Sequence, residues 1–451
     1  MKNPTVSRSA GEAGVDSTRR RLLLGASAAP LVAGSGIAMM PSRTEAALKT
    51  SARIVIAGSG LGGLAIASRL SRELDGAQIT VIDRKEVHNY QPGYTLVATG
   101  VWDVAKVSDR NVDLMPSGVE WVREMAAEFD PESNTVVTDT GRRIEYDYLV
   151  VATGLTMDFD AIEGMDVSAI GRNGLASVYP GPDAAQATWR AMDAFRQKGG
   201  NALMTLPATA LKCAGAPLKM TFMLADRLRQ AGTREASGIQ FHSALGNVFS
   251  VPRINEEVLR RWDALGIDVE FNSKLVAVDI GAQRATVISP EGERSEIDYD
   301  FIHVVPPMRA PDAVKNSALA WQEGGFAAGG WLEVDPKTLR HRRFPNVFGL
   351  GDINGTAKGK TAATVKKSAP IVATNLIDVI AGREPSQMFD GYTSCPLLLR
   401  EGAALLVEFD YENRLTPSLP GIDPLQDSYF AWLMKCYMLK PAYMAVAKGR
   451  V

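Results

Sequence analysis

Cysteine and histidine are scarce in this chain of 451 residues, which contains three cysteines and four histidines. So few cysteines exclude a disulfide scaffold. The histidines show no zinc-ligand spacing, so we expect no metal. The formal net charge is -2 at pH 7, which argues against a nucleic-acid partner, because proteins that neutralise phosphates carry a basic excess. If the cysteines matter, they matter through their chemistry.

The rest of the composition is that of a globular protein, with 46% hydrophobic and 22% charged residues, 41 glycines and 24 prolines. These values exclude collagen-like, coiled-coil and largely disordered chains. At about 150 residues per domain, the length predicts two or three domains.

Residues 1–46 have the composition of a targeting segment. Arginines at 19–21 precede the apolar run 22–40, and Ala46 and Ala47 offer a processing site. This order predicts a twin-arginine export signal, and hence a periplasmic protein peripheral to the inner membrane. The alternative is a membrane-anchoring or disordered tail that is never cut.

The clearest motif follows this segment. The β-branched run Arg53–Ala57 leads into Gly58-Ser59-Gly60-Leu61-Gly62-Gly63, then into a helical stretch, Leu64–Leu74, and a second strand, Gln78–Ile82. A strand, a glycine-rich turn, a helix and a strand within about thirty residues predict a dinucleotide-binding βαβ unit.

Each glycine of this motif has an expected role in binding a dinucleotide. Gly58 permits the tight turn, Gly60 lets the backbone approach the diphosphate, and Gly63 lets the helix pack closely on the strand. Asp83 ends the second strand, where an acid hydrogen-bonds a ribose hydroxyl. A sterically packed turn alone would not explain this acid.

Two later segments indicate FAD as the dinucleotide. The strand Tyr148–Val151 ends in Ala152-Thr153-Gly154, and the strand Asn346–Gly349 is followed by Gly351-Asp352. Both resemble contact motifs of flavoproteins with two dinucleotide-binding domains, in which the aspartate that matches Asp352 binds the ribityl chain. Lys360 and Thr361 open a further predicted helix, whose N-terminus is expected to face the flavin pyrimidine ring. A solvated lysine on a loop is the alternative.

The predicted fold class is α/β, with two Rossmann-like domains and a C-terminal membrane-interface segment. We assign residues 47–165 and 301–385 to the FAD domain, 166–300 to an inserted NAD-like domain, and 386–451 to the C-terminal region.

The inserted domain lacks its glycine fingerprint. Where that motif is expected, Cys213 lies beside Lys212 and before a helix that begins near Pro217, a setting that favours a thiolate. The alternative is a small buried residue at a turn.

The second notable cysteine, Cys395, lies far along the chain from Cys213. If both thiols face one side of the isoalloxazine ring, they can alternate between disulfide and dithiol, and a thiolate can attack the flavin C4a atom. A disulfide needs a Cα separation of roughly 4.4 to 6.8 Å. The third cysteine, Cys436, is interpreted as a packing residue.

Four segments resemble sulfide:quinone oxidoreductases, in particular the type that includes the mitochondrial enzymes: Lys212–Pro217, Asp390–Pro396, His88–Gly93 and Glu408–Tyr411. The resemblance implies oxidation of hydrogen sulfide to sulfane sulfur, with two electrons passed to a membrane quinone and the sulfur to a thiol, sulfite or sulfide. It also implies that Cys395 carries the persulfide and that Cys213 forms the thiolate or flavin adduct. Some relatives hold FAD through a further cysteine, which is absent before Lys212, so we expect noncovalent FAD.

The stretch Tyr429–Val446 bears on the electron acceptor, because five of its residues are aromatic. It is shorter than the roughly 20 apolar residues of a spanning helix, and aromatics with flanking lysines are typical of a membrane interface. A helix that covers the core or a dimer interface is the alternative.

Two other functions stay open: a flavocytochrome c-type sulfide dehydrogenase, and a non-catalytic flavin-binding partner protein. The missing fingerprint disfavours a type II NADH dehydrogenase.

Overall fold

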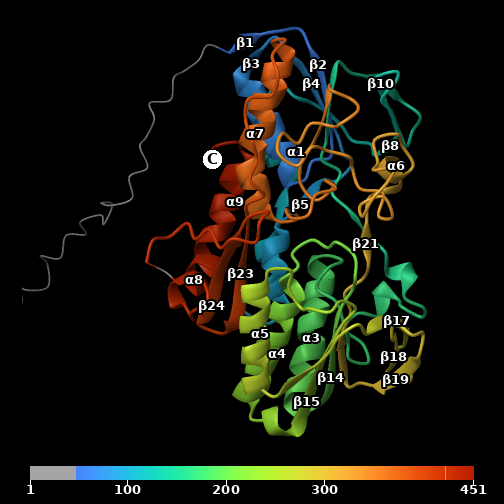
Figure 1. Cartoon of the computed structure of the whole chain (residues 1–451), viewed down its shortest axis with the longest axis vertical. Helices are drawn as coiled ribbons and strands as arrows, with labels where there is room; N and C mark the ends of the chain where they lie inside the picture. Colours follow the sequence, from blue (N-terminus) through green and yellow to red (C-terminus); the bar gives the residue numbers. More distant parts are fainter. Residues whose placement is uncertain (1–46, 422) are drawn as a thin grey trace, which may run out of the picture. The chain divides into compact units, whose positions relative to one another are not determined.

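The computed structural model describes residues 47–421 and 423–451. Its first large sheet is built from five parallel strands in the order β22-β11-β2-β4-β7. Helix α1 (Leu61–Glu73) follows β2 and packs beside α7 (Ala362–Ile380) (Figure 1). These five strands are β2 (Arg53–Ala57), β4 (Gln78–Ile82), β7 (Glu120–Val122), β11 (Tyr148–Val151) and β22 (Val347–Gly349).

The second large sheet also has five parallel strands, in the order β13-β20-β14-β15-β16. Figure 1 shows α3 (Pro182–Lys198), α4 (Ala216–Ala231) and α5 (Pro252–Ala264) beside these strands. Two parallel sheets flanked by helices confirm the predicted α/β class with two Rossmann-like units. The strands are β13 (Leu175–Ala176), β14 (Gly200–Leu206), β15 (Ser237–Ser243), β16 (Ile267–Glu270) and β20 (Phe301–His303).

Smaller elements decorate the two sheets. Two three-stranded antiparallel sheets have the orders β10-β9-β8 and β17-β18-β19, and short strands pair as β1-β3, β5-β6 and β12-β21. Their bounds are β1 (Leu48–Lys49), β3 (Leu74–Asp75), β5 (Val87–Asn89), β6 (Ser108–Arg110), β8 (Ala126–Asp130), β9 (Thr135–Thr138), β10 (Arg143–Glu145), β12 (Thr156–Met157), β17 (Lys274–Asp279), β18 (Arg284–Ile288), β19 (Arg294–Asp298) and β21 (Met308–Arg309). Two short α-helices, α2 (Tyr94–Val97) and α6 (Asp312–Lys315), also lie among these elements.

The C-terminal part of the chain joins both sheet units. The hairpin β23 (Thr393–Arg400) and β24 (Ala403–Phe409) packs against α4, next to which Figure 1 draws it. Helix α8 (Tyr429–Leu433), a π-helical turn (Met434–Met438) and α9 (Leu439–Ala447) follow in sequence. Within the described ranges, no helix has both the length and the hydropathy to cross a bilayer.

Candidate active site

The glycine-rich turn has the geometry of a dinucleotide cradle. Gly58 adopts φ +111°, and a Cβ there would lie 2.4 Å from the carbonyl oxygen of Ala152. A Cβ on Gly63 would lie 1.8 Å from the oxygen of Gly58, so only glycine lets α1 approach the strand. A Cβ on Gly60 would meet nothing within 4 Å, and this open space lets a ligand reach the backbone.

Asp83 holds this turn in place. One carboxylate oxygen accepts a hydrogen bond from the Ser59 backbone N–H at 2.7 Å, and the other accepts one from the Lys85 N–H at 2.9 Å. The side chain is buried. The contact of Asp83 with a ribose hydroxyl stays a prediction, while its bond to the glycine turn is a role that the motif did not reveal.

The other predicted cofactor residues lie at the same edge of the first sheet. Strands β2, β11 and β22 are neighbours in parallel register, so the residues after their carboxyl ends converge. These residues are Gly58, Ala152, Thr153, Gly154, Gly351 and Asp352. The Thr153 hydroxyl is buried with no hydrogen-bond partner among the described residues, and an orphaned hydroxyl beside this edge fits a bound FAD.

Lys360 lies under this edge rather than in solvent. Its Nζ donates to the carbonyl oxygens of Asp352 at 2.6 Å and Asn354 at 2.9 Å, and lies 3.6 Å from the centre of the Trp331 ring. Burial lowers the pKa of Lys360 to about 7, and burial raises the pKa of Asp352. Thr361 caps α7, accepting a hydrogen bond from the Thr364 N–H, as the sequence predicts for a helix that begins here.

The two cysteines meet where three distant segments are joined. The Cys213 N–H donates to the Lys360 carbonyl at 3.0 Å, and the Thr361 hydroxyl lies 2.8 Å from that of Thr393, two residues before Cys395. A Cβ added to Gly215 would lie 2.3 Å from Cys395 Sγ, so glycine at this position leaves room for the sulfur. Cys213 itself has φ +49°, a conformation that costs energy for a residue with a side chain.

The two thiols have opposite pKa shifts. A hydrogen bond with Cys395 lowers the pKa of Cys213, and the Lys219 and Lys435 ammonium groups lower it further against the effect of burial. The same hydrogen bond, together with burial, raises the pKa of Cys395. The pKa of Cys213 is therefore the lower of the two, which makes Cys213 the more reactive sulfur.

Two buried lysines supply the positive charge, and neither is among the site residues predicted from the sequence. Lys219 Nζ donates to Cys213 Sγ at 3.4 Å from the first turns of α4. Lys435 Nζ donates to the Pro92 carbonyl at 2.5 Å, and the π-helical turn places it inward while Tyr437 faces out. Lys212, which is predicted to favour the thiolate, is half-buried, and desolvation lowers its pKa to about 8 while the charges of Asp352 and Cys213 oppose this shift.

A signal for Lys219 exists in the sequence. Every residue of α4 from Ala216 to Leu228 is buried, so a lysine among its apolar positions demands an anionic partner. Lys435 gives a weaker signal, because its aromatic neighbours suggest an interface at which lysine reaches water.

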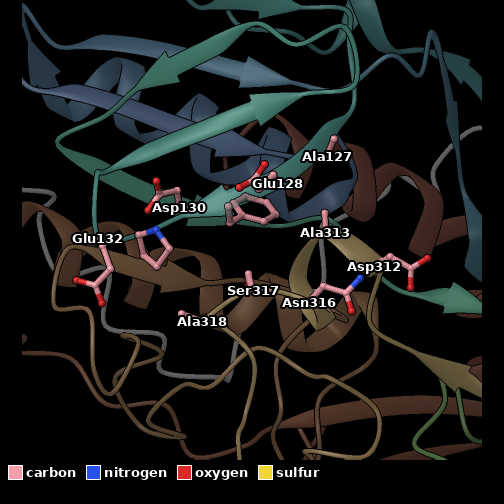
Figure 2. Close-up of a pocket in the computed structure, with 11 residues that line it drawn as sticks. Ala127, Glu128, Asp130, Glu132, Asp312, Ala313, Asn316, Ser317 and Ala318 are labelled. Atoms are coloured by element: carbon pink, nitrogen blue, oxygen red, sulfur yellow. The ribbon is translucent and has the colours of Figure 1, made fainter.

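A separate pocket of about 320 Å³ lies between β8 and α6 (Figure 2). Four carboxylates line it: Glu128, Asp130, Glu132 and Asp312. Its negative charge disfavours both hydrosulfide and a dinucleotide diphosphate. Neither Cys213, Cys395 nor the glycine turn lines this pocket, so it is not the site of sulfur chemistry.

Comparison with known proteins agrees with this geometry. Residues 52–370 match the family described as pyridine nucleotide-disulphide oxidoreductase. The chain is 36% identical over 405 residues to the mitochondrial sulfide:quinone oxidoreductase of Dictyostelium discoideum, covering 89% of this chain and 87% of that protein. It is 33% identical to the mitochondrial enzyme of Mus musculus, with coverages of 88% and 86%. The crystal structure of the sulfide:quinone oxidoreductase from Aquifex aeolicus superposes with a TM-score of 0.72 at 22% identity, over 89% of this chain and 92% of that one.

The fold and the matching family define an FAD-dependent oxidoreductase with two dinucleotide-binding units. At this similarity over most of its length, the chain belongs to the sulfide:quinone oxidoreductase family. The resemblance stated from the four segments is thereby confirmed.

The prediction of twin-arginine export to the periplasm is wrong, because the relatives of 32 to 36% identity are mitochondrial enzymes. Residues 1–46 themselves lie outside the described residues. Arginines ahead of an apolar run do not specify one route, since organelle-targeting segments are also rich in arginine.

Replacing Lys435 tests the electrostatic origin of the thiolate. Burial lowers the pKa of Lys435 to about 7, so its positive charge is present below that pH and lost above it. In Lys435→Met the apparent pKa of the Cys213 thiol, measured from the pH dependence of iodoacetamide alkylation, should rise by about one unit. The profiles should differ on the acid side and converge at high pH. Lys366→Met, an exposed change on α7, is the matched control, and superimposable profiles for all three proteins would contradict the assignment.

Proposed function

We propose that this protein oxidises hydrogen sulfide through a redox pair formed by Cys213 and Cys395, and passes the electrons through noncovalently bound FAD to a membrane quinone. The carrying observation is the pair of neighbouring thiols, Cys213 half-buried and Cys395 buried, which have opposite pKa shifts and are joined to the cofactor edge through Lys360. The relatives are named as sulfide:quinone oxidoreductases or as a sulfide-quinone reductase, and these names support sulfide and quinone as the substrates.

The sulfur steps follow from this asymmetry. Hydrosulfide attacks Cys395 of the oxidised pair; the bond between the two cysteines breaks, a new S–S bond forms on Cys395, and Cys213 leaves as the thiolate. The low pKa of Cys213 makes it the better leaving group. A second nucleophile, a thiol, sulfite or sulfide, then takes the outer sulfur and leaves Cys395 as a thiol. The two cysteines close again to a disulfide, which releases two electrons and one proton.

The buried lysines support these steps by charge. Lys219 is 2% exposed and donates to Cys213 Sγ, so it stabilises the departing thiolate. Lys435, also 2% exposed, has its pKa lowered to about 7 by burial, so below that pH it adds a second positive charge that favours entry of an anion such as hydrosulfide or sulfite.

FAD supplies a carrier that accepts an electron pair from sulfur and passes it on to quinone. The residues proposed to hold it are Gly58, Gly60, Gly63, Asp83, Ala152, Thr153, Gly154, Gly351, Asp352, Lys360 and Thr361. Because no cysteine precedes Lys212, we propose that these contacts hold FAD without a thioether. We also propose the domain boundaries predicted from the sequence, with residues 47–165 and 301–385 in the FAD domain, 166–300 in the inserted domain and 386–451 in the C-terminal region.

Serine at either cysteine tests the mechanism. Cys213→Ser and Cys395→Ser should each retain FAD, because neither sulfur lies in the glycine turn, but should lose sulfide-dependent bleaching of the flavin absorbance under anaerobic conditions. Cys436→Ser, at a buried packing position, is the matched control and should still bleach. Bleaching at the wild-type rate in both redox-cysteine variants would refute the scheme.

An aromatic patch on the C-terminal segment supports access to the quinone from a membrane. Four apolar side chains of α8 and the π-helical turn are strongly exposed: Tyr429 (64%), Phe430 (45%), Tyr437 (69%) and Met438 (53%). The same turns bury Trp432, Lys435 and Cys436, so one face packs on the protein and the other faces outward. A tyrosine-rich outer face suits the headgroup level of a bilayer.

Removing this patch should release the protein from membranes. Phe430→Ser with Tyr437→Ser should lower co-sedimentation with phosphatidylcholine and phosphatidylglycerol vesicles at least tenfold, because two aromatic side chains leave the interface. Met125→Ser with Phe271→Ser removes two exposed apolar side chains elsewhere and should change nothing. Equal sedimentation of both double variants would contradict membrane docking through this face.

A further inference from the structure

The end of the C-terminal segment is fastened to the helix that follows the glycine turn. Ser68 of α1 donates to the carbonyl oxygen of Ala447 at 3.0 Å, at the last residue of α9. Arg72 donates to the carbonyls of Lys448 and Gly449. These are carbonyls at a helix C-terminus, which lack partners within the helix, so α1 satisfies the end of α9.

A chain of buried side chains runs from α9 back to the glycine turn itself. The Tyr443 hydroxyl lies 2.8 Å from His88 Nε2, and His88 Nδ1 lies 3.0 Å from Asn111 Oδ1. Asn111 Nδ2 donates to the Ser59 hydroxyl oxygen at 2.8 Å. All four side chains are at most 8% exposed. Ser59 stands between Gly58 and Gly60, so the chain ends inside the proposed diphosphate cradle.

The two hydrogen bonds that Asn111 Nδ2 donates assign the donors and acceptors along this chain. Asn111 Nδ2 also donates to the Lys85 carbonyl at 2.6 Å, which uses both amide hydrogens and leaves Oδ1 as the acceptor for His88. His88 therefore carries its proton on Nδ1, and Nε2 accepts from the Tyr443 hydroxyl. The Ser59 oxygen accepts from Asn111, and its own proton has no acceptor among the described side chains and backbone.

We propose that Tyr443 is a positioning residue for the cofactor. Acting through His88 and Asn111, it keeps the Ser59 hydroxyl oriented so that its proton is donated to the diphosphate of FAD. Retention of FAD and docking of the C-terminal segment then stabilise each other. This inference rests on the placement of FAD at the glycine turn, which belongs to the proposed function.

Such coupling has to be reciprocal. If the docked segment strengthens FAD binding, bound FAD must strengthen docking of the segment by the same factor. Backbone amides of α9 should consequently exchange hydrogen more slowly in the holoenzyme than in protein stripped of FAD.

Tyr443→Phe tests the inference because it removes one hydroxyl and keeps the ring. The dissociation constant of FAD, measured on the purified holoenzyme from the fluorescence of released FAD, should be about fivefold higher in this variant. A change of this size corresponds to the loss of one hydrogen bond. Tyr146→Phe is the matched control: it is 1% exposed, and its hydroxyl has no partner in the described part of the chain. Release equal to that of the control would overturn the inference.

A double-mutant cycle separates coupling from local damage. Ser59→Ala should weaken FAD retention, and adding Tyr443→Phe to it should cause no further loss, since the hydroxyl through which Tyr443 acts is gone. Additive losses would refute the connection.

Gly60→Val tests the placement of FAD independently, because it fills the open space beside the turn. Retained FAD in that variant would refute the placement itself. Lost FAD in Gly60→Val with wild-type retention in Tyr443→Phe would refute the coupling alone.

Discussion

Cys213 is partly buried, and the groups packed around it lower the pKa of its thiol and so favour the negatively charged thiolate. Lys219 and the Cys395 thiol both donate to it, and Lys435 adds a second ammonium group. Without these partners burial would favour the neutral thiol. The three partners come from α4, β23 and the π-helical turn, so one charge links the second sheet unit, the hairpin and the C-terminal segment. Cys213 has a positive φ, and the contacts around it hold the residue in this strained conformation.

Local motifs made much of the site predictable. Gly58, Gly60 and Gly63 belong to one turn. The backbone conformation and close approach that require glycine there can be predicted from the short motif itself. The strands around 148–151 and 346–349 end where the sequence predicts. Parallel pairing then brings the carboxyl ends of β2, β11 and β22 together by geometry alone.

The remainder depends on contacts between residues far apart in the chain, which no local pattern encodes. Cys213 and Cys395 were singled out by their settings, yet their meeting depends on the hydrogen bonds of Lys360 and Thr361. Aromatics with flanking lysines predict a membrane interface, and a regular helical pattern does not anticipate the π-helical turn in which Lys435 is buried. Asp83 was expected to bind a ribose and also fastens the turn. The targeting segment, residues 1–46, was mispredicted for a different reason: arginines before an apolar run occur in several kinds of targeting signal, and the prediction assigned them to one kind.

The C-terminal segment combines both kinds of contact: Lys435 on its inner face lowers the pKa of Cys213, Tyr443 is linked to the glycine turn through His88 and Asn111, and its outer face is aromatic. A single segment thereby borders the sulfur site, the cofactor and the proposed membrane surface. Peptide mapping of the oxidised protein under non-reducing conditions is the most direct measurement of the central claim, the meeting of the two thiols. A peptide pair linked between Cys213 and Cys395 is the predicted result. Recovery of the two residues only as separate free thiols, or linked to Cys436 instead, would contradict the account.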